Sequence, residues 1–103
     1  MNDGFFLVSD VASIGEGEAK RVEIGAMLIL IYRYQGQFYS TSAFCPHQDV
    51  SLDPNNCQGN EIICKSHGYR MNFTTGVCMT DPSLFFPAFQ TKVDSGQVWV
   101  KLK

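Results

Sequence analysis

Two short segments of the chain each combine a cysteine with a histidine. The first is Cys45-Pro46-His47 and the second is Cys64-Lys65-Ser66-His67, and residues 48–63 lie between them. These are the only two histidines among the 103 residues. Thiolate and neutral imidazole are ligands of zinc and of iron–sulfur clusters. We therefore expect Cys45, His47, Cys64 and His67 to bind one metal centre.

The residue types alone leave two kinds of metal centre open. Two cysteines and two histidines satisfy the tetrahedral geometry of a zinc site that holds together a structural or binding module. Common zinc spacings, however, group cysteine with cysteine and histidine with histidine, whereas each segment here contains one of each. A mixed segment suits a binuclear cluster between two loops, because each loop then reaches both irons when the cysteines bind one iron and the histidines the other. A Cys–His nucleophilic enzyme is less well supported, since the sequence shows neither an orienting third group nor an oxyanion hole.

The stretches Phe44-Cys45-Pro46-His47-Gln48 and Cys64-Lys65-Ser66-His67-Gly68 resemble the C-x-H and C-x-x-H motifs of the Rieske family. Within that family the chain is most similar to the small ferredoxins of bacterial ring-hydroxylating oxygenase systems. The resemblance implies one [2Fe–2S] cluster per chain, with Cys45, His47, Cys64 and His67 as its ligands. It also implies an electron carrier rather than an enzyme. The carrier would make transient contacts with an NAD(P)H-dependent flavoprotein ferredoxin reductase and with a terminal oxygenase. A Rieske-like small subunit of another reductase is the alternative.

The resemblance also suggests roles for residues around the four ligands. Gly68 would let backbone N–H groups approach a sulfide, and Pro82 would belong to a loop that covers the cluster. The candidates for a docking surface flank the histidines: Pro46, Gln48, Val50 and Tyr69.

Four positions distinguish this sequence from respiratory Rieske proteins. Those proteins have a second cysteine in each cluster loop, which together form a disulfide, and the matching residues here are Val50 and Ser66. They also have a serine and a tyrosine that donate hydrogen bonds to the cluster sulfurs, where this chain has Tyr69 and Met71. Fewer donors leave more negative charge on the cluster, so we expect a potential near the low end of the Rieske range of about −150 to +300 mV.

The elements that must position these residues are short strands. Stretches of apolar and β-branched residues, separated by turn residues, predict strands at 5–8, 20–24, 27–34 and 37–42, and a closing hairpin within 89–102. All four cysteines, both histidines and all four prolines lie between residues 43 and 87, where only 61–64 and 69–73 resemble strands. We predict an all-β fold in a single Rieske domain over 1–103. Its base is a small antiparallel β-sandwich or barrel (1–42 and 88–103), with an inserted, loop-rich cluster-binding subdomain at about 43–87.

Composition excludes some partners. The net charge of −2 and the isoelectric point near 5.5 do not favour a nucleic-acid partner, which would need a basic face. The longest apolar run, 24–32, is too short to cross a bilayer, which takes about 20 helical residues. No targeting segment is visible at the N-terminus. We therefore expect a soluble, cytoplasmic protein, without membrane contact and monomeric.

The two remaining cysteines receive structural interpretations. Cys57 lies among polar residues and is predicted to be an exposed thiol, whereas Cys78 follows a turn and is predicted to be packed. A disulfide between them is not expected in a reducing compartment. The aromatic residues are predicted to serve as core and cover: Phe5, Phe6, Phe38, Tyr39, Phe85, Phe86 and Phe89.

Overall fold

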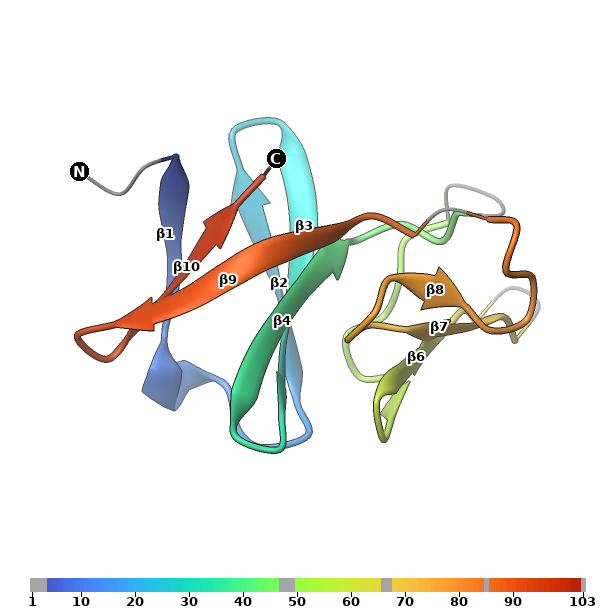
Figure 1. Ribbon diagram of the computed structural model, residues 1–103, viewed down its shortest axis with the longest axis horizontal. Helices are drawn as coiled ribbons and strands as arrows, with labels where there is room; N and C mark the ends of the chain where they lie inside the picture. The colour runs from blue at the N-terminus through green and yellow to red at the C-terminus, as the bar shows by residue number, and fades with distance from the viewer. Residues whose placement is uncertain (1–3, 47–49, 66–67, 85, 103) are drawn as a thin grey trace.

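The computed structural model describes residues 4–46, 50–65, 68–84 and 86–102, and it contains two antiparallel sheets (Figure 1). The larger sheet has six strands in the order β1-β10-β9-β4-β3-β2, and the smaller has four in the order β5-β6-β7-β8. The six are β1 (Phe5–Asp10), β2 (Ala19–Ile24), β3 (Met27–Tyr34), β4 (Gln37–Ser42), β9 (Ala88–Asp94) and β10 (Gln97–Lys101). The four are β5 (Cys57–Gln58), β6 (Glu61–Ile63), β7 (Arg70–Asn72) and β8 (Val77–Cys78). The predicted all-β class is confirmed.

Strand boundaries follow the sequence pattern most closely where the strands are long. β3 and β4 have the predicted bounds, whereas β1 is longer than predicted and β6 and β7 are shorter. The two-residue strands β5 and β8 were not predicted, because two residues carry no periodic pattern. A three-residue 3-10 helix, η1 (Val11–Ser13), follows β1. In the part of the chain that the structure describes, no helix has the length and apolar character needed to cross a membrane.

Two tight turns fix the register of the larger sheet. Gln35 and Gly36 have φ angles of 52° and 77°, and Ser95 and Gly96 have φ angles of 54° and 76°. Two successive positive φ angles are typical of the type I′ turn, whose twist matches that of the flanking strands. The turns place β3 opposite β4 and β9 opposite β10 without slippage.

The edge strands of the larger sheet, β1 and β2, curve toward each other, so that the sheet approaches a barrel (Figure 1). The Lys20 ammonium group on β2 donates to the Ser9 hydroxyl on β1 over 3.3 Å. A first core fills the interior with wholly or almost wholly buried residues: Ile14, Ile29, Ile31, Phe38, Val98 and Val100. Val98 and Val100 alternate along β10, and both side chains contribute to this core.

β3 contributes to two cores at once. Ile29 and Ile31 belong to the first core, whereas Leu30 and Tyr32 belong to a second core that includes residues of the smaller sheet. Successive side chains of a strand point to opposite faces. A strand covered on both faces therefore needs an unbroken apolar run, which explains the sequence of β3.

An aromatic cluster joins the two sheets. The Phe73 ring, just after β7, stacks on Tyr32 with ring centroids 4.1 Å apart and an angle of 4° between the planes. Tyr34 meets the same ring edge-on at 5.8 Å, and Tyr39 lies 6.0 Å from it. The smaller sheet is thus held against the face of β3 and β4 that does not contribute to the first core.

The prediction that the aromatic residues serve as core and cover is correct in part. Phe38 and Phe86 are buried, but Phe6 is 47% exposed, so the prediction is wrong for Phe6. It lies on the edge strand β1, which has a neighbour on one side only. Phe85 is outside the described residues.

Candidate metal centre

Two of the four predicted ligands, Cys45 and Cys64, lie at strand ends in the second core. Cys45 follows β4 closely, and Cys64 comes directly after β6. Both side chains are 0% exposed and belong to the same cluster of buried residues. The fold therefore brings together two thiols that are 19 positions apart in sequence (64 − 45).

The two loops that begin at these cysteines close in the same way. The Cys45 amide donates to the Val50 carbonyl over 2.8 Å, and the Cys64 amide donates to the Tyr69 carbonyl over 2.8 Å. In each case the amide of the cysteine bonds to the carbonyl five residues further on. In sequence, each closed loop contains one histidine.

His47, Gln48, Ser66 and His67 lie outside the described residues, so the structure places two of the four predicted ligands. Within the described ranges, no three histidine, cysteine or acidic side chains gather closely enough to hold a metal ion. The full ligand set therefore remains a prediction.

The surroundings of the two cysteines fit the cluster that the sequence predicts. Their neighbours in the second core are apolar, among them Leu52, Ile62 and Met71. A thiolate is costly to bury without a compensating positive charge, and iron supplies that charge. Two thiolates and two neutral imidazoles would leave an oxidised [2Fe–2S] centre with no net charge, which suits an apolar site.

The other two cysteines differ from the ligand candidates. All four thiols are described, and each is free of a disulfide. Cys78 on β8 is 0% exposed, as predicted. Cys57 is half-buried on β5, so the prediction of an exposed thiol is wrong. Its loop folds back to pair with β6, and burial, with a smaller effect of the Asp53 carboxylate, raises the pKa of Cys57 to about 11.

The predicted flanking residues differ in how far solvent reaches them. Pro46, Val50 and Tyr69 are half-buried, and the last two pack against the second core. Gly68 has a φ of 70°, which favours glycine, and its amide donates to the Cys64 carbonyl over 2.9 Å. Pro82 is exposed in a turn where the Asp81 carboxylate accepts bonds from the amide and hydroxyl of Ser83. These bonds lower the pKa of Asp81.

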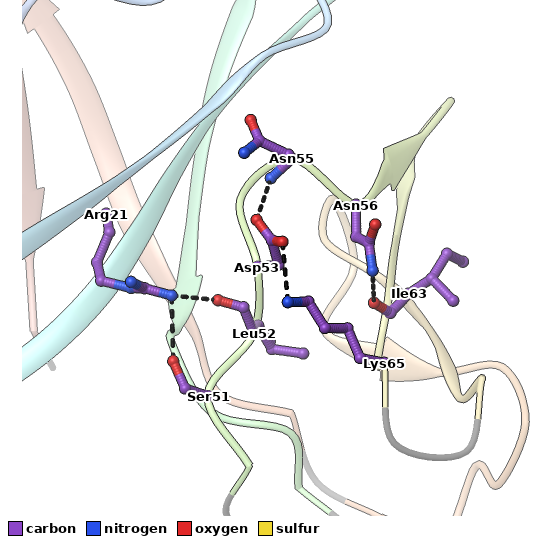
Figure 2. A network of polar contacts seen from close by, with 8 residues as sticks. All are labelled: Arg21, Ser51, Leu52, Asp53, Asn55, Asn56, Ile63 and Lys65. Carbon is purple, nitrogen blue, oxygen red and sulfur yellow. Dashed lines mark hydrogen bonds and ion pairs between the residues drawn. The ribbon is translucent and has the colours of Figure 1, made fainter.

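Sequence reasoning missed a polar network between the larger sheet and both loops (Figure 2). Arg21 on β2 donates to the Ser51 hydroxyl over 3.1 Å and to the Leu52 carbonyl. The Asp53 carboxylate pairs with the Lys65 ammonium group at 3.2 Å and accepts a hydrogen bond from the backbone N–H of Asn55. This hydrogen bond has the largest effect in lowering the pKa of Asp53, and Lys65 and Arg21 lower that pKa further. The turn at 53–56 is readable in the sequence, but Arg21 gives no local signal because it lies about 30 positions away.

Comparison with known proteins agrees with this geometry. The chain is 31% identical to ferredoxin CarAc of Metapseudomonas resinovorans over 97% of this chain and 95% of that protein. It is 27% identical to the ferredoxin component of the alkene monooxygenase system of Xanthobacter autotrophicus over 90% and 77% of the two chains. Among solved structures it is similar to a chain in a complex of reduced oxygenase and oxidized ferredoxin in carbazole 1,9a-dioxygenase. That match has a TM-score of 0.86 and 30% identity, and it covers 99% of this chain and 98% of the other.

The family comparison assigns residues 4–89 to the Rieske [2Fe-2S] domain. This range includes both loops and most of both sheets. The matched cysteine–histidine segments, the buried thiols and the similarity over nearly the whole chain agree with one another. The chain belongs to the Rieske [2Fe–2S] domain family, and this membership implies one such cluster in the chain.

Proposed function

We propose that this protein carries single electrons to a terminal oxygenase, and that Cys45, His47, Cys64 and His67 bind its cluster. The observation that supports the ligand set is the pair of wholly buried cysteines, each at the start of a loop closed by the same backbone bond. Each of these loops contains one of the two histidines. The bound cluster supplies a one-electron redox couple.

The partners follow from the relatives. One relative is named a ferredoxin, and another is named the ferredoxin component of an alkene monooxygenase system. A similar chain of known structure comes from a complex of reduced oxygenase and oxidized ferredoxin. This chain would likewise act as a carrier and not as the catalyst. We propose a flavoprotein reductase that uses NAD(P)H as the donor, transient contacts with both partners, a monomeric state and a cytoplasmic location. Transient redox contacts bury small areas, below roughly 1,200 Å².

The burial of the two cysteines sets the direction from which a partner approaches. Cys45 and Cys64 are covered by the second core, so a partner reaches the centre from the loop side and not from the larger sheet. The residues proposed for docking belong, by their place in the sequence, to the two loops: Pro46, Gln48, Val50 and Tyr69. Val50 and Tyr69 pack partly against the core, so each would offer only its exposed part.

We also propose that the domain consists of a base and a cluster-binding part. Residues 1–42 and 88–103 would form the base, and about 43–87 would form the cluster-binding part. In support, the described strands of the larger sheet come from 5–42 and 88–101, and those of the smaller sheet from 57–78.

Metal analysis tests the ligand set. Protein purified without oxygen should contain iron and labile sulfide in equal amounts, and its reduced form should give the EPR signal of a Rieske centre. His47→Ala and His67→Ala should each lose that signal. Cys78→Ser is the control, because Cys78 is buried in the same core as the two proposed cysteine ligands but should not bind iron. Zinc without sulfide would contradict the proposal and favour a structural zinc site.

Reconstitution tests the electron transfer. The protein, a flavoprotein reductase and NADH should together support turnover of an oxygenase of this class. Added bulk at Val50 should slow the transfer while leaving the visible spectrum unchanged. Equal transfer rates for this variant and the parent would argue against docking on the loop side.

A further inference from the structure

The two cluster loops are far apart in the sequence, and a side-chain ion pair joins the described parts of the chain next to them. Lys65 directly follows Cys64 at the start of the second loop, and Asp53 lies just beyond the close of the first. The Lys65 ammonium group and the Asp53 carboxylate are 3.2 Å apart (Figure 2). Any metal centre bound by both loops depends on their separation, so a contact across them acts on that centre.

The acidic partner of this pair is held in place by its own turn, independently of the lysine. The backbone N–H of Asn55 donates to the Asp53 carboxylate over 2.9 Å and so fixes this carboxylate within the turn. The Asp53 side chain is 27% exposed, whereas that of Lys65 is 60% exposed. Exposed ion pairs contribute little in part because pairing costs side-chain entropy, and an acceptor that is already fixed reduces this cost.

A second set of contacts ties the first loop to the larger sheet. Arg21 on β2 donates to the Ser51 hydroxyl and to the Leu52 carbonyl, immediately before Asp53 (Figure 2). The contacts therefore run from β2 to the end of the first loop, and from there to the start of the second. Each step joins segments that the backbone ladders of the two sheets do not pair.

On the basis of the proposed function, we propose that Asp53 and Lys65 are positioning residues for the cluster, joined to the sheet through Arg21. Their pair fixes the spacing of the two loops. The Asp53 carboxylate also balances the positive charge of Lys65, and Lys65 directly follows Cys64, a proposed cluster ligand. The chain lacks the two extra cysteines that form a disulfide between these loops in respiratory Rieske proteins, with Val50 and Ser66 at those positions. The ion pair thus supplies a cross-loop contact of another kind.

Fixing the spacing of the loops and balancing the Lys65 charge predict different responses to substitution, and the charge role is tested by the midpoint potential. Lys65→Met removes the bridge and leaves the Asp53 carboxylate unbalanced, which disfavours an added electron and lowers the midpoint potential. Asp53→Asn removes the same bridge but leaves the Lys65 charge unbalanced, which raises the potential. The double variant removes both charges and should return close to the parent potential. A contact that served stability alone would not give shifts of opposite sign.

The rate of cluster loss tests whether the Asp53–Lys65 ion pair fixes the spacing of the loops. In the presence of an iron chelator, each single variant should lose its visible absorbance about two- to fivefold faster than the parent, as expected for a partly exposed ion pair. The double variant should be no faster than the singles, because either substitution already breaks the bridge. Lys65→Arg keeps the charge and should retain the cluster as the parent does.

The Glu61–Arg70 pair is the matched control. Its atoms are 3.6 Å apart and its side chains are 21% and 54% exposed, but it joins β6 to β7, which already share a backbone ladder. Glu61→Gln should therefore change the rate of cluster loss less than Asp53→Asn does.

Any other pattern overturns the proposal: potentials that do not move or that move in the same direction, additive rates of loss, or a control variant as fast as the test variants. The iron and sulfide content of the parent is a separate readout. A parent that holds zinc refutes the proposed function, whereas a normal [2Fe–2S] parent with unresponsive variants refutes only the positioning role.

Discussion

Burial decides the chemistry of individual thiols in this chain. Cys45, Cys64 and Cys78 are wholly buried, and the first two gain a metal partner in the proposed centre. Cys57 stays accessible in part, with its thiol directed to the Pro54 carbonyl at 3.7 Å. Desolvation disfavours its thiolate, and the Asp53 carboxylate adds to the effect.

Cys57 should therefore react slowly with iodoacetamide. The nucleophile is the thiolate, and the pKa of Cys57 is raised to about 11, so at pH 8 its ionised fraction is below that of an ordinary thiol. The labelling rate of the cluster-loaded protein should still be rising at pH 10, where the rate for a free thiol such as glutathione approaches its plateau. Mass spectrometry follows the label, and Cys57→Ala provides the blank. A plateau at or below pH 10 would contradict the burial of this thiol.

Met71 bears on the redox potential. It lies where respiratory Rieske proteins have a tyrosine that donates to a cluster sulfur, and its side chain is 0% exposed in the second core. A thioether has no hydrogen to donate, so this position cannot withdraw charge from the cluster. We expect a midpoint potential near the low end of the range of about −150 to +300 mV. Protein-film voltammetry at pH 7 measures it, and a value well above zero would contradict the role assigned to this position.

Among the elements, the turn between β7 and β8 is constrained by backbone packed against it. Gly76 has a φ of 79°, and a Cβ built there would lie 3.0 Å from the Phe86 carbonyl oxygen and 3.2 Å from the Ala88 Cβ. The turn thus abuts the chain that enters β9, which leaves no room for a side chain. Gly36, in the turn between β3 and β4, has a similar φ of 77° but no neighbour within 4 Å.

These two glycines form a matched pair for a stability measurement. Gly36→Ala should lower the free energy of unfolding by about 1–2 kcal/mol, the cost of a left-handed conformation for a residue with a Cβ. Gly76→Ala should cost more, because a backbone oxygen cannot move aside as a flexible side chain can. Urea unfolding of both variants gives the comparison. Equal losses would show that the contact at Phe86 is not restrictive.

The strands and turns also show which features of the fold can be predicted from the sequence alone. The unbroken apolar run of β3 and the turns at Gly36 and Gly96 were readable, because their patterns are local and repeat over several residues. The two cysteine–histidine segments were readable for the same reason. β5 and β8 are too short to carry a pattern, and the contact between Arg21 and Leu52 depends on the tertiary fold. The half-burial of Cys57 also depends on the fold, because its local sequence is polar.

At the scale of the whole molecule, the two sheets pack together at a joint formed by Phe73 and Tyr32. Phe73 stacks on Tyr32 of β3 and belongs to the same buried cluster as Cys45 and Cys64. The surroundings of the two thiols are therefore continuous with the packing that holds the smaller sheet on the larger one. Loosening this joint should act on the metal centre as well as on global stability.

Phe73→Ala tests this coupling. Removing a buried phenylalanine costs about 3–5 kcal/mol, and here the cavity would open between Tyr32 and the smaller sheet. Phe38→Ala is the control, because Phe38 is buried in the first core, which contains neither cysteine. Urea unfolding should show comparable losses for the two variants, whereas chelator-driven loss of the visible absorbance should accelerate much more for Phe73→Ala. Equal acceleration in both variants would mean that cluster retention follows global stability, and that the joint has no separate influence on the metal centre.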